Sequence, residues 1–98
     1  MDGIMEYLLN EKQMTETVAV RTVKKVSKHE DIRAEFEFWI KNKSYNLENP
    51  LVVGGYTARD IYSLAPFLDG VGVFNFMVTL REDPAKAKEY ITGGFKRK

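Results

Sequence analysis

The sequence predicts an α+β fold, on three observations. β-Branched side chains are concentrated in residues 15–26 and favour a strand. An apolar stripe of helical period begins at Ile32, and the second half carries helix-capping residues at regular intervals. We expect a single domain, residues 1–98, in which residues 1–53 form a β-hairpin and one long helix and residues 54–98 form a three-helix half.

The N-terminal segment predicts the hairpin. Its strands would be residues 4–9 and 15–26, because β-branched side chains alternate over Val18–Thr22 as they do in a half-buried strand. Val23 falls out of this phase and indicates a bulge or a strand end. A helix over residues 2–13 is an alternative that the pattern leaves open.

One long helix is predicted after the hairpin. Ser27 and Glu30 have the spacing of a capping box. Apolar side chains then recur at helical spacing: Ile32, Phe36, Trp39 and Ile40. The pattern stops near Lys43. Phe38 lies on the opposite face of this helix, so either the predicted strands cover it or it belongs to a contact surface.

The middle of the chain predicts a short strand and then a short helix. Residues 51–53 are apolar and long enough for a third strand. Thr57 and Asp60 form a second capping box. We expect the helix that they open to end before Pro66, because the residue before a proline is steered away from helical angles.

Residues 70–81 satisfy two patterns, since their apolar side chains fit both a strand and a helix. The flanks favour a helix. Asp69 is a helix-capping residue type, and Asp83 with Pro84 is a typical helix start. A last helix is predicted over residues 84–92, with Gly93 as its C′ residue and Phe95 folding back on the final turn.

Composition excludes several classes of protein. Fifteen Lys and Arg against fourteen Asp and Glu leave a formal charge of +1, without the basic excess typical of nucleic-acid-binding domains. The absence of cysteine excludes disulfides and thiolate metal sites. No apolar run approaches the roughly 20 residues of a membrane span, and the acidic N-terminus does not resemble a secretory signal. We expect a cytoplasmic protein without a membrane partner.

Catalytic signatures are lacking. The single histidine, His29, is predicted on the surface of a first helical turn. The acids nearby are predicted to be solvated helix residues, and a paired-carboxylate hydrolase would need an acid held in an apolar pocket. We therefore expect no enzyme activity, no cofactor and no metal.

Two features suggest nucleic-acid contacts. Residues 57–81 have the proportions of a helix-turn-helix, and Asn75 on the second helix is a residue type that pairs with adenine. The predicted reading face nevertheless lacks Arg and Lys. The basic residues cluster elsewhere: Arg21, Lys24, Lys25 and Lys28, with a second short cluster at Lys96–Lys98. A surface strand guarded against aggregation by its lysines is the simpler interpretation.

The apolar excess of residues 71–80 indicates a helix that is central or partly covered by a partner. We expect a small non-catalytic adaptor that acts through protein contacts or self-association, with Phe38 and Phe76 in the contact surface. The alternative is a nucleic-acid-binding regulator that uses residues 57–81 or the basic residues at 21–28.

Three motifs in the second half carry a resemblance. They are “GYTA…DIY” from Gly55, an aromatic-Asn-aromatic centre at residues 74–76, and “LREDP…A” from Leu80. Over Pro50–Lys98 the chain resembles short uncharacterised bacterial proteins, which often lie in conjugative or other mobile elements of Gram-positive bacteria. The resemblance covers about half of the chain. It implies no activity, and it favours a helical reading of residues 57–92.

Overall fold

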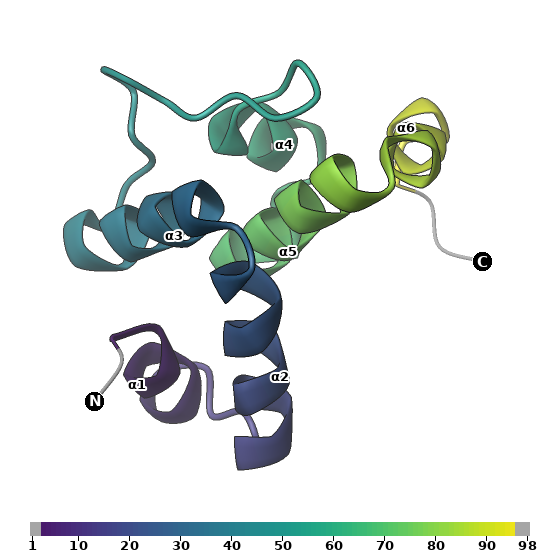
Figure 1. Cartoon of the computed structure of the whole chain (residues 1–98). Coiled ribbons are helices and arrows are strands. Elements are labelled where there is room, and N and C mark those ends of the chain that lie inside the picture. The colour runs from purple at the N-terminus through teal and green to yellow at the C-terminus, as the bar shows by residue number, and fades with distance from the viewer. Residues whose placement is uncertain (1–2, 96–98) are drawn as a thin grey trace.

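The computed structural model describes residues 3–95, which form six α-helices and one short 3-10 helix and contain no strand (Figure 1). The elements are α1 Gly3–Asn10, α2 Glu16–Ser27, α3 Glu30–Asn42, α4 Ala58–Leu64, η1 Pro66–Leu68, α5 Asp69–Glu82 and α6 Pro84–Thr92. The predicted α+β class is therefore wrong, and the fold is all-α. The basic segment Lys96–Lys98 lies outside the described residues.

The predicted second strand is the helix α2. Thr15 is its N-cap, and the Thr15 hydroxyl accepts a hydrogen bond from the amide of Val18 at 3.3 Å. The inward positions of α2 are Ala19, Thr22, Val23 and Val26. This spacing of i, i+3, i+4 and i+7 is that of one helix face. Val23, which is out of phase in a strand, is in phase in the helix.

The predicted first strand is the helix α1, so the alternative helical interpretation was the correct one. Ile4 and Leu8 lie one turn apart and are both fully buried. A strand would also place these two positions on one face, so their spacing does not separate the two structures. The chain leaves α1 through Gln13, which has a positive φ of 52°, and Met14 donates to the Leu8 carbonyl at 3.0 Å.

The predicted third strand over residues 51–53 is reduced to one antiparallel bridge. Val53 and Tyr56 exchange two backbone hydrogen bonds, of 2.8 and 3.0 Å. Between them Gly54 and Gly55 have φ values of 59° and 89°, a conformation that glycine adopts without strain. The chain reverses within two residues, and no partner strand extends the bridge within residues 3–95.

Of the four predicted helix starts, three form side-chain caps and one does not. At the start of α5 the Asp69 carboxylate accepts from the amides of Val71 at 2.9 Å and Gly72 at 3.3 Å. Thr57 and Asp60 form the predicted capping box, with hydrogen bonds of 3.1 and 2.9 Å. Asp83 accepts from the Lys86 amide at 3.2 Å and opens α6. The box predicted at Ser27 does not form, because Ser27 is the last residue of α2 and His29 is the N-cap of α3.

Residues 70–81 are helical as predicted, and α5 is the central helix. Helices α2, α3, α4 and α6 all pack against it, and Figure 1 shows α5 crossing the middle of the molecule, with α6 near its C-terminal end. Phe74 of α5 stacks on Phe36 of α3, with ring centroids 4.8 Å apart. Both side chains are buried, so this pair is at the centre of the core.

The start of α5 packs closely against α3. Gly70 is buried beneath the Trp39 indole, and a Cβ atom at position 70 would overlap the benzo ring of Trp39. Glycine is therefore required here for space and not for an unusual backbone angle. The Trp39 ring of α3 therefore packs directly on the backbone of α5 at Gly70.

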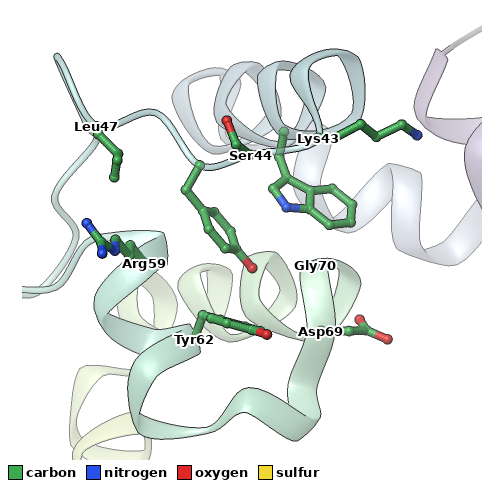
Figure 2. A pocket seen from close by; sticks show the side chains of 9 residues that line it. Lys43, Ser44, Leu47, Arg59, Tyr62, Asp69 and Gly70 are labelled. Atoms are coloured by element: carbon green, nitrogen blue, oxygen red, sulfur yellow. The ribbon is translucent and has the colours of Figure 1, made fainter.

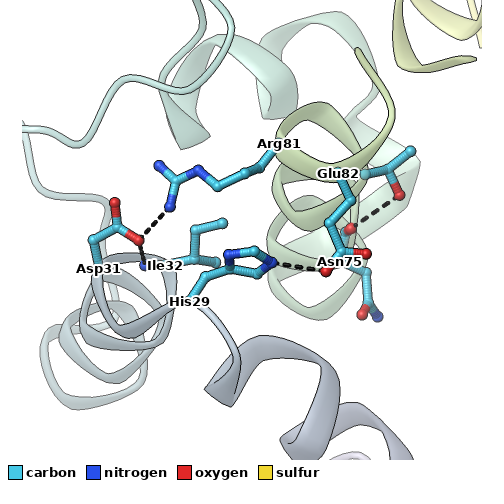
Figure 3. Close-up of polar contacts among 7 residues, drawn as sticks. His29, Asp31, Ile32, Asn75, Arg81 and Glu82 are labelled. Carbon is cyan, nitrogen blue, oxygen red and sulfur yellow. Dashed lines mark hydrogen bonds and ion pairs between the residues drawn. The ribbon is translucent and has the colours of Figure 1, made fainter. Parts of the chain in front are cut away.

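Polar side-chain contacts connect α3 and the preceding turn to the end of α5 (Figure 3). The Arg81 guanidinium donates to the Asp31 carboxylate at 2.6 Å, and His29 Nε2 lies 2.7 Å from a Glu82 carboxylate oxygen. The hydrogen bond from Arg81 holds the pKa of Asp31 below its usual value. The predicted solvated position of His29 is wrong, since its side chain is only 18% exposed.

Replacement of Gly70 by alanine is expected to destabilise the fold. The added methyl group must displace the Trp39 ring, and overpacking of this kind costs about 1–3 kcal/mol in free energy of unfolding. Chemical denaturation of wild type and Gly70→Ala measures the cost. In a Trp39→Phe background the benzo ring is absent, so the same substitution should cost less. An equal cost in both backgrounds would contradict the proposed packing.

The Asp31–Arg81 pair predicts a pH-dependent contribution to stability. Because the pKa of Asp31 is lower in the folded than in the unfolded state, the stabilisation is present above about pH 4. It is lost as the pH falls through the folded-state pKa. With both side chains partly exposed, the contribution is at most about 1 kcal/mol.

The measurement compares the free energy of unfolding of wild type and Asp31→Asn between pH 7 and pH 2. The difference should be largest near neutrality and vanish at the acid end. Glu48→Gln is the matched control, because Glu48 lies in an exposed loop and makes no ion pair within residues 3–95. A difference that is unchanged at pH 2 would argue against this pair.

Candidate functional site

A groove of about 1240 Å³ lies where α2, η1, α5 and α6 meet. Its lining is largely apolar and aromatic, with charged side chains from α2 and α6. We refer to it as the C-terminal groove. Because it is built from several helices, its shape depends on the packing of α5 against its neighbours.

The floor of the groove is a stripe of α5 that the rest of the protein covers only in part. Every residue from Gly70 to Leu80 is buried except those of a single stripe. The stripe consists of Gly72, Asn75, Phe76 and Thr79, and all four line the groove. Their spacing of i, i+3, i+4 and i+7 places them along about two helical turns.

One wall of the groove is a matching stripe of α6. It consists of Lys86, Glu89, Tyr90 and Gly93, again at i, i+3, i+4 and i+7. Ala87, on another face of the same helix, is fully buried and attaches α6 to the core. The groove is thus formed by the sides of two helices, with Phe67 and Leu68 of η1 closing one end.

Four aromatic rings dominate the lining. Phe76 lies 4.9 Å from Phe95 and 6.3 Å from Tyr90, measured between ring centroids. Phe67 lies 6.5 Å from Phe95. Phe67 and Tyr90 are 56% and 46% exposed, so the cluster is open to solvent on one side.

A helix C-cap places Phe95 in this cluster. The amide of Phe95 donates to the Tyr90 carbonyl at 2.8 Å, and Gly94 donates to Ile91 at 3.0 Å. These two bonds define a Schellman motif, in which Gly94 is the C′ residue with a φ of 67°. The predicted fold-back of Phe95 is confirmed, but the predicted C′ position, Gly93, is wrong by one residue.

The predicted basic residues come together on one face of α2. Arg21, Lys24, Lys25 and Lys28 fall within one side of the helix by their spacing. None of the four makes an ion pair within residues 3–95, and Lys25 lines the groove. A guarded strand edge, the simpler interpretation of the sequence, is wrong because these residues lie on the helix α2 and at its C-cap.

The two predicted contact residues do not share a surface. Phe76 is part of the groove, as is Asn75. Phe38 lies on α3, is 37% exposed, and is not among the groove residues. The strands that were one predicted cover for Phe38 do not exist. Sequence reasoning did not find Phe67, Tyr90 or Lys86, whose contribution depends on how α6 and η1 pack on α5.

A second hollow of about 480 Å³ lies between the α3–α4 link and the start of α5 (Figure 2). Its walls include Trp39, Tyr45 and Tyr62, with Arg59 and Asp69 at the rim. The Tyr45 ring packs against Tyr62 and Trp39, with ring centroids 5.7 and 6.2 Å apart, so these aromatic contacts form one wall of the hollow. Burial raises the pKa of Tyr45 to about 12.

No group of three or more His, Asp or Glu side chains among residues 3–95 is arranged to hold a metal ion. Comparison of the chain with protein-family models, with curated proteins and with solved structures gives no match. The resemblance of residues 50–98 to small proteins of bacterial mobile elements therefore stays a prediction.

Tyr45 is expected to ionise about two pH units above an ordinary tyrosine. An alkaline titration followed by absorbance near 295 nm should show a transition near pH 12 that is absent in Tyr45→Phe. Because unfolded Tyr45 would ionise near pH 10, it makes the folded state less stable as the pH rises above that value. Circular dichroism must show intact helices over the same range. Loss of a transition near pH 10 in the variant would contradict the assignment.

Proposed function

We propose that the protein is a small non-catalytic adaptor that acts through protein contacts, and that the C-terminal groove receives its partner. The observation that carries the proposal is the open aromatic cluster of Phe67, Phe76, Tyr90 and Phe95. Contiguous apolar surface of this kind, bordered by charged residues, is typical of interaction sites.

The composition of the groove supports a docking role. Aromatic side chains in a concave surface are the usual anchors of protein interfaces, because they bury large areas at low cost in conformational entropy. Asn75 and Thr79 add polar groups to the floor, which can fix the orientation of a bound chain. Phe76 is anchored between Phe95 and Tyr90 before binding, so part of the surface is preorganised.

The charged residues of the groove support a binding role over catalysis. Lys86 and Glu89 are exposed, and Lys25 is only partly covered. Acid–base catalysis needs a titratable group in a desolvated setting close to a reacting atom. In the same proposal we place the protein in the cytoplasm.

The alternative, a nucleic-acid-binding regulator, is favoured by the basic face of α2. The helix pair over residues 57–81 supports it less. Its two segments meet at 109°, within the range of helix-turn-helix motifs. However, the uncovered face of α5 carries neither Arg nor Lys, and affinity for nucleic acid depends largely on phosphate contacts.

No single helix among residues 3–95 has both the length and the hydropathy of a membrane span. Helix α4 and the segment Pro66–Glu82 reach the length and hydropathy of a span only when they are taken together, and the chain bends by 109° between them.

The adaptor proposal is tested with peptides selected against the wild-type protein from a random library. Binding of the selected peptides should fall at least about tenfold in Phe67→Ser and in Tyr90→Ser, since each loses an aromatic anchor. Leu64→Ser is the matched control. Leu64 is 50% exposed on α4 and does not line the groove.

Peptides that bind equally well to all three variants would exclude the groove as the docking surface. The alternative function is tested on the same samples by titration with duplex DNA and single-stranded RNA at low salt. Salt-dependent binding that is abolished by the double change Lys24→Glu and Lys25→Glu would establish the regulator in place of the adaptor.

A further inference from the structure

The C-terminal groove is bordered by more positive than negative charge. Lys25 of α2 and Lys86 of α6 line it, and the basic face of α2 continues from Lys25 through Lys24, Lys28 and Arg21. The full chain carries a net charge of only +1, so this excess is local. A local excess of one sign beside an apolar surface favours a partner of the opposite sign.

Three carboxylates lie in this region, and they are fewer than its five basic side chains. Asp83 caps α6 by accepting from the Lys86 amide at 3.2 Å. Glu89 lines the groove and is exposed. Glu82 lies 2.7 Å from His29, and this contact lowers its pKa, with smaller contributions from Lys28 and Lys25. The positive field of the α2 face therefore extends to the end of α5, and Glu82 is already engaged within the protein.

The walls of the groove favour a helical occupant over an extended one. Both walls are sides of helices whose backbone groups are paired internally, and no strand edge is present within residues 3–95. An extended chain would therefore leave many of its amides without partners against an apolar surface. A helix satisfies its own backbone and presents only side chains.

The size of the floor matches two helical turns. From Gly72 to Thr79 the floor runs along α5 for roughly 10 Å, at 1.5 Å per residue. Two turns of a bound helix have the same length and place apolar side chains at i, i+3 or i+4, and i+7 on one face. The opposite face and the edges of such a helix stay available for charged residues.

We propose that the occupant of the groove is an acidic amphipathic helix of another protein. Its apolar stripe packs on Phe67, Phe76 and Tyr90, and its carboxylates face Lys25 and Lys86. This inference rests on the proposed adaptor function and adds the chemistry of the partner.

Two other occupants are less suited to the groove. Nucleic acid would find only two basic side chains in the groove, Lys25 and Lys86, for its phosphates, and it would meet the carboxylate of Glu89 beside them. A second copy of the chain lacks a suitable stripe, because no helix within residues 3–95 exposes two large apolar side chains three or four residues apart. Both occupants are outcomes of the experiment below.

The experiment uses two fluorescein-labelled synthetic helical peptides. Both carry the same leucine and phenylalanine stripe at i, i+3, i+4 and i+7, and their polar faces are glutamate in one and lysine in the other. Fluorescence anisotropy with the full chain gives the two affinities at low and high salt. We expect the glutamate peptide to bind at least about tenfold more tightly at low salt, with the difference shrinking as salt screens the charges.

Charge-reversal variants locate the effect. Lys25→Glu and Lys86→Glu should each weaken the glutamate peptide by about fivefold and strengthen the lysine peptide. Lys88→Glu is the matched control, because Lys88 is on the same helix as Lys86, is exposed, and does not line the groove. Phe67→Ser should weaken both peptides equally.

The outcomes separate this inference from the proposed function. Equal binding of both peptides, lost in Phe67→Ser, would keep the adaptor and overturn the acidic partner. Absence of binding by either peptide would overturn the helical occupant. An oligonucleotide that binds more tightly than the glutamate peptide, or a concentration-dependent dimer that Phe67→Ser dissociates, would replace the acidic helix with nucleic acid or a second copy.

Discussion

Burial of the apolar faces of α5 is the constraint on which the fold depends. It positions the four helices that pack against α5, namely α2, α3, α4 and α6. A helix of 14 residues that is hydrophobic nearly all round must be covered on most sides. The stack of Phe74 on Phe36 and the contact of Gly70 with Trp39 fix α3 against it. The ion pair between Asp31 and Arg81 then joins the other end of α5 to the start of α3.

The covering is incomplete on one stripe, and the candidate site follows from that. Between Gly70 and Leu80, the residues Gly72, Asn75, Phe76 and Thr79 are the ones that no helix covers fully. The short helix α6 reaches over only one side of the stripe, and its C-cap turns Phe95 back against Phe76. The groove therefore lies along the stripe of α5 that its four neighbouring helices leave partly exposed.

The helical second half follows from local signals that act within a few residues. The Thr57–Asp60 box, the Asp83–Pro84 start and the flanks of α5 each stabilise one helix end, so their sequence patterns predict the structure well. The N-terminal error has a non-local cause. β-Branched residues in α2 have strand propensity, but tertiary packing of Ala19, Thr22 and Val26 overrides it. The groove depends on packing between distant segments, which no local pattern specifies.

The position of Trp39 makes its intrinsic fluorescence a probe of helix packing. This residue is the single tryptophan of the chain, and its ring covers Gly70 at the start of α5, whereas none of the groove-lining residues touches the smaller hollow that it borders. Its emission therefore reports whether α3 and the start of α5 remain packed together. Unfolding can thus be followed in the unlabelled protein, and the label on a peptide is needed only to measure its binding.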